Sequence, residues 1–175
     1  MIDWNLYLKY YPRKGVLVWR DRDPESFLSR NMPARWKTLF VGKVAGYEFR
    51  ARGVPRAVVV RLNGQLYLAH RIIWEMVNGP IPDGMLVDHK DGNPWNNKLD
   101  NIRLATPAQN AMNRKTRRDS KVGIKGIYVK CGAWYSRIQV GSDRFIEGPF
   151  DTPEIAHASY CKMAKKHFGE FARFS

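Results

Sequence analysis

The feature that most constrains the fold is a tightly spaced series of apolar and polar pieces near the middle of the chain. An apolar run ends in the adjacent pair Asp88 and His89, and a polar turn follows at once. Residues 101–104 alternate like a second short strand, and Thr106 followed by Pro107 is a typical start of a helix. The sequence therefore predicts a hairpin followed directly by a helix, with polar side chains from each piece near a common point.

The side chains of this unit limit its chemistry. Asp88 and Asn110 offer hard oxygen ligands, which suit Mg²⁺ or Mn²⁺ better than a metal that prefers thiolates. His89 offers a nitrogen that can take a proton from water, and Asn101 offers an amide that can hold an imidazole or a backbone. Such a set can hydrolyse a phosphodiester. Polar turns and capped helices are also ordinary structural features, so a purely structural interpretation stays open here.

Three runs carry a family resemblance: DHKDGN at 88–93, NNKLDNIR at 96–103 and ATPAQN at 105–110. Together they resemble the HNH nuclease motif, and they are most similar to the subgroup found in phage and intron homing endonucleases. The sequence departs from the three-letter name because Asn110 stands where many relatives have the last His. An asparagine there still offers an oxygen ligand. The resemblance implies the ββα-metal fold for this unit.

The resemblance also implies a role for each polar residue. His89 would be the general base, and Asn101 the residue that orients it. Asp88 and Asn110 would be ligands of one divalent metal, either Mg²⁺ or Mn²⁺. Asn101 lies 13 positions and Asn110 lies 22 positions after Asp88, so several spaced elements agree with the motif.

The overall charge points to a polyanionic partner. Thirty Lys and Arg against 16 Asp and Glu give a net charge of +14. Residues 1–60 carry 12 basic against 5 acidic residues, 61–120 carry 9 against 6, and 121–175 carry 9 against 5. This spread favours double-stranded DNA lying along most of the molecule, although a basic face is often only a solvated surface.

Other compositional features set the expected class. No apolar run approaches the roughly 20 residues that span a bilayer, and the N-terminus lacks a secretion signal, so we expect a protein inside the host cell of a phage or mobile element. Cys131 and Cys161 are isolated and form no CxxC pair. We therefore expect neither a structural zinc nor a disulfide.

The region before the motif is predicted to be rich in β-strands. Residues 16–19 predict a strand and residues 20–35 a loop with short helical turns, so we interpret 1–56 as a plug against the nuclease core. Two β-rich runs around Asn63 and Gly64 predict a hairpin with a type I′ turn, and residues 70–77 predict a largely buried helix. His70 opens this helix, and we expect it to be structural or to contact phosphate rather than to act as a base.

A basic run follows the motif at 113–121. It is either a solvated linker or a strap across a DNA groove, and the two interpretations are compatible. The basic residues assigned to DNA contact in this run are Arg114, Lys115, Arg117 and Arg118.

The last part has a pattern of its own. Segments 126–130, 133–140 and 144–147 predict three antiparallel strands, and Thr152 followed by Pro153 predicts the start of a helix. The helical residues at the spacing of one buried face are Ala156, Ser159, Tyr160, Met163, Ala164 and Phe168. A helix behind a three-stranded sheet leaves the other sheet face open.

This part resembles the plant ethylene-response-factor (APETALA-type) DNA-binding domain, which is also appended to phage HNH endonucleases. The matching residues are Gly126-Ile127, Trp134, Arg137-Ile138, the run GPFDT at 148–152 and residues 156–160. The resemblance implies that the open face enters the major groove. Alternation then assigns six residues to DNA: Lys125, Tyr128, Lys130, Arg137, Gln139 and Arg144. Ile146 and Gln139 depart from the plant pattern, so the target sequence does not carry over.

The sequence thus predicts an α+β protein: an N-terminal β-rich segment (1–56), an HNH nuclease domain (57–116), a basic linker (113–121) and an ethylene-response-factor-like domain (122–175). We interpret it as a site-specific, metal-dependent DNA endonuclease that acts as a monomer on DNA. It would nick one strand and leave 5′-phosphate and 3′-hydroxyl ends. The alternatives are a non-catalytic sequence-specific DNA-binding protein that uses the ββα unit as scaffold and a nonspecific nuclease, which a second DNA-reading domain disfavours.

Overall fold

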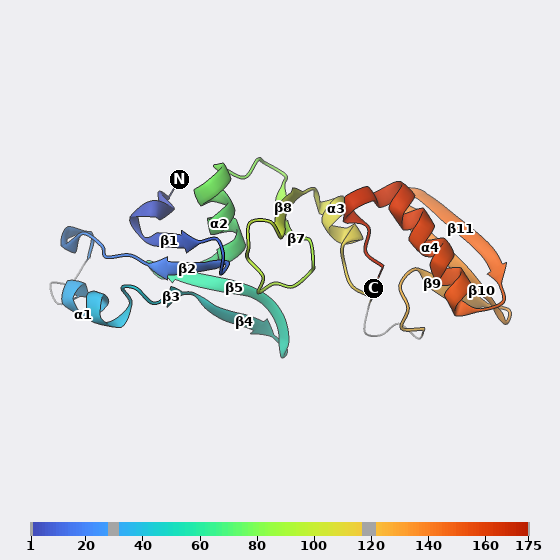
Figure 1. Cartoon of the computed structure of the whole chain (residues 1–175), viewed down its shortest axis with the longest axis horizontal. Coiled ribbons are helices and arrows are strands. Elements are labelled where there is room, and N and C mark those ends of the chain that lie inside the picture. Colours follow the sequence, from blue (N-terminus) through green and yellow to red (C-terminus); the bar gives the residue numbers. More distant parts are fainter. Residues whose placement is uncertain (1, 28–31, 117–121, 175) are drawn as a thin grey trace. The chain divides into compact units, whose positions relative to one another are not determined.

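The computed structural model of the chain describes residues 2–27, 32–116 and 122–174. Packing divides the chain into two compact units, Met1–Leu104 and Ala105–Ser175, which Figure 1 shows in blue to yellow-green and in yellow to red. Each unit has a hydrophobic core of its own.

The first unit combines short helices with antiparallel strands. Its helical elements are η1 (Trp4–Leu6), η2 (Pro24–Ser26), α1 (Met32–Leu39) and α2 (Ala69–Asn78). Its strands are β1 (Leu8–Tyr11), β2 (Val16–Trp19), β3 (Val44–Ala45), β4 (Tyr47–Ala51), β5 (Val54–Leu62), β6 (Gln65–Leu68), β7 (Leu86–His89) and β8 (Ile102–Ala105). They form sheets in the orders β1-β2-β3, β4-β5-β6 and β7-β8.

The hairpin and helix predicted before the motif are both confirmed. Asn63 and Gly64 join β5 to β6 with φ angles of 50° and 82°, the two positive values that a type I′ turn requires. Helix α2 follows directly and buries Ile72 and Ile73. It ends at Gly79, whose φ is 83° and whose N–H donates to the carbonyl of Glu75.

The segment predicted as a loop at 20–35 ends in a regular helix. Helix α1 begins at Met32 and runs past the predicted boundary to Leu39. Trp36 is the buried residue of this helix, and its ring packs edge-on against Trp19 of β2 at 5.0 Å between centroids. Aromatic packing therefore stabilises a helix that has weak amphipathic signal in the sequence.

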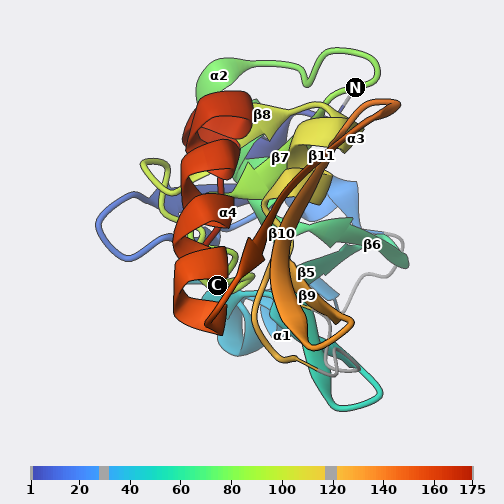
Figure 2. The same ribbon diagram turned by 90° about the vertical axis from the view of Figure 1, so that its right-hand side faces the viewer.

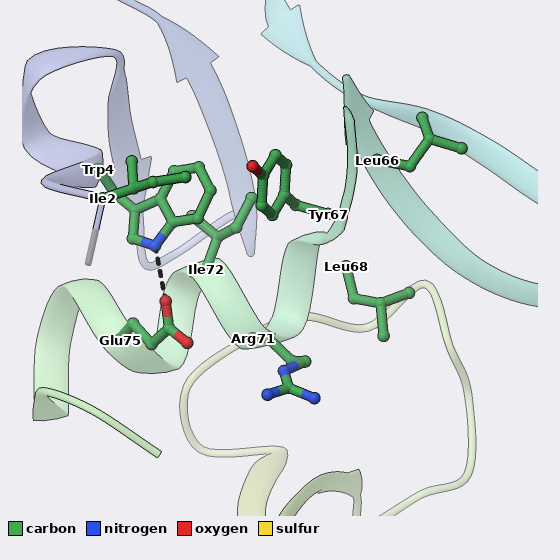
Figure 3. A pocket seen from close by; sticks show the side chains of 8 residues that line it. All are labelled: Ile2, Trp4, Leu66, Tyr67, Leu68, Arg71, Ile72 and Glu75. Carbon is green, nitrogen blue, oxygen red and sulfur yellow. Dashed lines mark hydrogen bonds between the residues drawn. The ribbon is translucent and has the colours of Figure 1, made fainter. Parts of the chain in front are cut away.

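The N-terminal segment packs against the central elements of the first unit. Leu8 and Leu17 are almost fully buried in one cluster with Ile73 and Val87. Figure 3 shows Trp4 of η1 over α2, where its Nε1–H donates to Glu75 Oε2 at 2.7 Å beside a cavity of about 450 Å³. The first β-hairpin and η1 therefore belong to the same core as α2 and β7.

The second unit consists of short α3, a three-stranded sheet and a long helix. Its elements are α3 (Pro107–Met112), β9 (Ile127–Lys130), β10 (Ala133–Val140), β11 (Asp143–Phe150), α4 (Pro153–Phe168) and η3 (Gly169–Phe171). The sheet is antiparallel with β10 in the centre, and Figure 2 shows α4 lying along it.

Helix α4 covers one face of this sheet, as the sequence predicts. Ala156, Tyr160 and Ala164 of α4 are buried, and they share a cluster with Ile127 and Ile138 of the sheet. The predicted α+β fold, with its β-rich first part, hairpin-and-helix unit and sheet on a helix, is confirmed. The four domain boundaries stay a prediction. In the described ranges, no helix is both long enough and apolar enough to cross a membrane.

Candidate functional site

β7 ends in two consecutive residues with chemically active side chains, Asp88 and His89. Asp88 and His89 are only 8% and 9% exposed, although they are polar. As neighbours on a strand, their side chains leave opposite faces. Buried polar groups are costly unless they are hydrogen-bonded, so the partners of each side chain define the site.

Asp88 forms an ion pair with Arg103 of β8. The Nε and Nη2 atoms of Arg103 each donate to Asp88 Oδ2 at 3.2 Å, and the two side chains are 10% and 8% exposed. A guanidinium presents its donors in a rigid fork, so this pair fixes the direction of the carboxylate. The pair connects the two strands of the predicted hairpin.

His89 is held through its ring nitrogen Nε2. This atom lies 2.8 Å from Oδ1 of Asn97, which is 3% exposed. An amide oxygen only accepts hydrogen bonds, so Nε2 carries the hydrogen and Nδ1 keeps the lone pair. With a hydrogen on Nε2, Nδ1 is the ring atom that can take up a proton.

Asn101, the residue predicted to orient His89, holds the loop between the strands. Its Nδ2 donates to Asp91 Oδ1 at 3.0 Å and to the Asn96 carbonyl at 2.7 Å, and its Oδ1 accepts from the Asp91 N–H. Burial alone would raise the pKa of Asp91, but hydrogen bonds from Asn96, Asn93 and Asn101 lower it below its usual value. Asn97 makes the hydrogen bond to His89 Nε2.

His70 lies against the other side of the site. Its ring meets that of His89 edge-on, with 4.9 Å between centroids and 71° between planes. Burial first, and then the charges of His89 and Arg71, lower the pKa of His70 to about 3. Its Nδ1 is buried and has no hydrogen-bond partner within the described part of the chain. His70 is therefore a neutral ring that packs on the candidate base.

Asn110 lies on α3, in the second unit. The predicted start of this helix is confirmed: Thr106 Oγ1 accepts from the Gln109 N–H at 3.2 Å, and Gln109 Oε1 accepts from the Thr106 N–H at 2.8 Å. This capping box fixes the first turn, on which Asn110 stands.

Asp88 in the first unit offers a carboxylate oxygen, and Asn110 in the second unit offers an amide oxygen. Each is a donor type that Mg²⁺ or Mn²⁺ accepts. Among residues 2–27, 32–116 and 122–174, no group of three or more His, Cys, Asp or Glu side chains could hold a metal. A site with few protein ligands is usual for Mg²⁺, which takes the rest from water and phosphate.

Asn97 and Arg103 were not singled out in the sequence, although both lie within the motif. Opposite charges at 88 and 103 on paired strands were a usable signal for the ion pair. Asn97 follows another asparagine in an irregular loop, so periodicity gives no sign of its direction. Only the folded loop distinguishes Asn97, which is buried, from Asn96, which is partly exposed.

The open face of the second sheet carries several of the residues predicted to contact DNA. Strand pairing puts Tyr128 opposite Tyr135 and Gln139 opposite Arg144. The two tyrosine rings stack at 5.5 Å, and the Arg137 guanidinium lies 5.4 Å from the Tyr128 ring centroid. Ile127, Ser136 and Ile138 alternate with these residues and are buried, so the cationic residues occupy the face away from α4.

Lys125 and Lys130, two further predicted DNA contacts, lie in different environments. Lys125 precedes β9, and its Nζ donates to the carbonyls of Met112 at 2.9 Å and Arg114 at 2.7 Å. Burial first, and then the charge of Arg173, lower the pKa of Lys125 to about 8. Lys130 is exposed at the end of β9. Of the basic run, Arg114 and Lys115 are exposed, and Arg117 and Arg118 lie outside the described residues.

Part of the chain matches a known nuclease family. Residues 67–112 match the family model of the HNH endonuclease, a range that includes His70, Asp88, His89 and Asn110. Protein 3.8 of Escherichia phage T7 is 37% identical over 107 residues, which cover 60% of this chain and 88% of that protein.

A second relative carries the nuclease in its name. It is the uncharacterized HNH endonuclease L560 of Acanthamoeba polyphaga mimivirus, 38% identical over 104 residues, which cover 59% of this chain and 54% of the relative. The chain thus spans about half the length of the mimivirus protein. No solved structure matches the chain significantly.

Proposed function

Because the chain belongs to the family of phage T7 protein 3.8 and carries an HNH endonuclease domain, we propose that it is a site-specific, metal-dependent DNA endonuclease. The observation that carries the proposal is the buried pair at the end of β7. Asp88 is directed by Arg103, and His89 is held in one tautomer by Asn97. A base and a carboxylate on adjacent residues, each with a buried partner, suit hydrolysis better than a purely structural role.

Asp88 and Asn110 would hold the divalent cation, Mg²⁺ or Mn²⁺. When bound, such an ion polarises a phosphate oxygen and stabilises the charge that develops on the departing oxygen. Arg103 would keep the Asp88 carboxylate in a fixed direction for this purpose, through the two bonds to Oδ2.

His89 would act as the general base. Because Nε2–H donates to Asn97, Nδ1 is the atom whose lone pair would accept a proton from the attacking water. The neutral His70 ring against His89 would keep a second positive charge away from the base. Asn101 would hold the intervening loop through Asp91 and Asn96. The expected products are 5′-phosphate and 3′-hydroxyl ends, and one such centre per chain would nick one strand per binding event.

The second unit would choose the target. Its exposed sheet face presents Tyr128, Arg137, Gln139 and Arg144, which combine phosphate-binding charge with groups able to read base edges. The exposed Arg114 and Lys115 would add backbone contacts. An ethylene-response-factor-like mode of binding is part of this proposal, with double-stranded DNA as the partner and a monomer as the acting species.

The test uses supercoiled DNA that carries candidate target sites, incubated with Mg²⁺ or Mn²⁺. The wild type should give discrete nicked or linear product, a chelator should abolish it, and His89→Ala should slow it by about 10²- to 10⁴-fold. His167→Ala, on α4 in the other unit, is the matched control and should cut normally.

DNA binding measured in parallel distinguishes the nuclease from a non-catalytic DNA-binding protein. Both His89→Ala and the wild type should shift target DNA on a gel. If both shift DNA and neither cuts with any divalent metal, the chain is a DNA-binding protein that uses the unit as scaffold.

A further inference from the structure

The candidate base is supported from outside the matched HNH segment. Asn97, which holds His89, lies in the irregular loop between β7 and β8. The Tyr10 hydroxyl of β1 donates to the backbone carbonyl of Asn97 at 3.2 Å. Tyr10 precedes the HNH match, which begins at residue 67, by a long stretch of chain.

The turn of the same hairpin touches the next peptide. Gly15, between β1 and β2, has a φ of 66°, and a Cβ on this residue would lie 2.8 Å from the backbone N of Lys98 and 3.0 Å from the carbonyl carbon of Asn97. Such distances are closer than side-chain carbons tolerate, so only glycine lets the two backbones meet here. The hairpin therefore contacts the Asn97–Lys98 peptide at two points.

The hairpin is a rigid support because its own inner side chains are in the core. Leu8 is fully buried and Leu17 is 2% exposed, and both pack in the cluster that also holds Val87 of β7. The loop's internal bonds from Asn101 reach Asp91 and Asn96. The contacts to the carbonyl side of Asn97 come from the hairpin.

We propose that the β1–β2 hairpin is a positioning element for the general base, with Tyr10 and Gly15 fixing the backbone of Asn97 and Asn97 fixing the His89 ring. The proposal rests on the proposed nuclease function, to which it adds a role for the N-terminal segment. Tyr10, Gly15 and Asn97 are positioning residues, because they act on the reaction only through His89. A 1 Å error in the place of a base lowers a rate by up to about 10²-fold.

The experiment uses the full chain with Tyr10→Phe, which removes one oxygen, and Gly15→Ala, which forces the backbones apart. Tyr11→Phe is the matched control, since Tyr11 is the exposed neighbour on the same strand. The first readout is the tautomer of His89, measured from its imidazole ¹⁵N and ¹³C NMR shifts at mildly alkaline pH. The second readout is cleavage, separated into kcat and KM, and thermal unfolding checks that each variant is folded.

Both hairpin variants should shift His89 from a single Nε2–H tautomer toward a mixture and should lower kcat by about tenfold with little change in KM. Tyr11→Phe should do neither. Because the effect passes through Asn97, adding Tyr10→Phe to Asn97→Ala should change kcat no further.

Two results overturn the proposal. One is a folded Tyr10→Phe protein with the wild-type tautomer and kcat. The other is a Tyr10→Phe effect that persists in full in the Asn97→Ala background. The NMR readout needs no cleavage, so a wild type that fails to cut would end the proposed function while the tautomer still decides the role of the hairpin.

Discussion

The two units differ in how far their functional polar residues are buried. In the first unit, the polar groups of the site are buried: Asp88, His89, Asn97, Asn101 and Arg103 are all less than 10% exposed. In the second unit, the predicted DNA contacts on β10 and β11 are exposed.

This difference follows from the work proposed for each unit. A buried charge or ring is held in one geometry by its partners and interacts strongly in a medium of low dielectric, which suits chemistry. An exposed cation remains solvated until it meets phosphate, and it then contributes through counterion release. The comparison predicts that substitutions in the first unit affect stability and rate, whereas those on the second sheet affect DNA affinity.

The largest effect on stability is expected for the buried ion pair. Arg103→Met leaves the Asp88 carboxylate buried without this counter-charge, so the free energy of unfolding should fall by about 3–5 kcal/mol. Arg50→Met is the matched control, because Arg50 pairs with Glu48 at a similar distance while both side chains are half exposed. The control should cost at most about 1 kcal/mol.

Urea unfolding followed by tryptophan fluorescence measures both variants, because five of the six tryptophans lie in the first unit. Equal losses for the two variants would show that burial does not distinguish these pairs.

The next effect is a pH dependence due to His70. The pKa of His70 is about 3 in the folded protein and 6.5 in the unfolded chain. Between these pH values the unfolded chain therefore binds more protons than the folded protein. Stability should therefore fall by a few kcal/mol as pH is lowered from 6.5 toward 3, at about 1.4 kcal/mol per unit of pKa difference.

His70→Phe should remove this part of the slope in urea unfolding measured across that pH range. His167→Gln, in the other unit, should keep it. Parallel slopes for wild type and His70→Phe would mean that His70 titrates alike in both states.

Most of the fold could be predicted from local signals. The turn at Asn63–Gly64, the ends of α2 and the cap at Thr106 each depend on neighbouring residues, and all three are confirmed. Helix α1 was not predicted as a regular helix, since residues 20–35 were expected to form a loop with short helical turns. The packing of Trp36 on Trp19 supports this helix, and that contact is distant in sequence.

The candidate site was predictable in its composition but not in its support. The adjacent Asp88 and His89 were evident from the motif, and both are buried in the structure. Asn97 and Tyr10 are separated by most of the first unit, so the bond from the Tyr10 hydroxyl to the Asn97 carbonyl depends on the tertiary fold alone. The assignment of site roles stays a prediction until the variants are measured.

A smaller effect is expected on the exposed sheet face. Arg137→Ala and Arg144→Ala should each weaken DNA binding by about tenfold at moderate salt and reduce the slope of log K against log salt by about 1, with unfolding unchanged. Lys162→Ala on α4 is the control, because this exposed lysine lies on the helix behind the sheet. Affinity measured by fluorescence anisotropy at several salt concentrations decides the matter. A fall in kcat at saturating DNA with unchanged affinity would contradict the division between the units.

The smallest effect is expected at Lys125, a partly buried residue of the second unit that was predicted to contact DNA. Its Nζ is occupied by the Met112 and Arg114 carbonyls, so Lys125→Met should destabilise the second unit by less than about 1 kcal/mol and leave the salt slope of DNA binding unchanged. Its folded pKa of about 8 lies below the usual 10.5, so wild-type stability should rise slightly as pH increases between these values, and the variant should lack this rise. Hydrogen exchange of the β10 amides measures the stability. A salt slope reduced by about 1 would instead place this ammonium on phosphate and return Lys125 to the DNA-binding face.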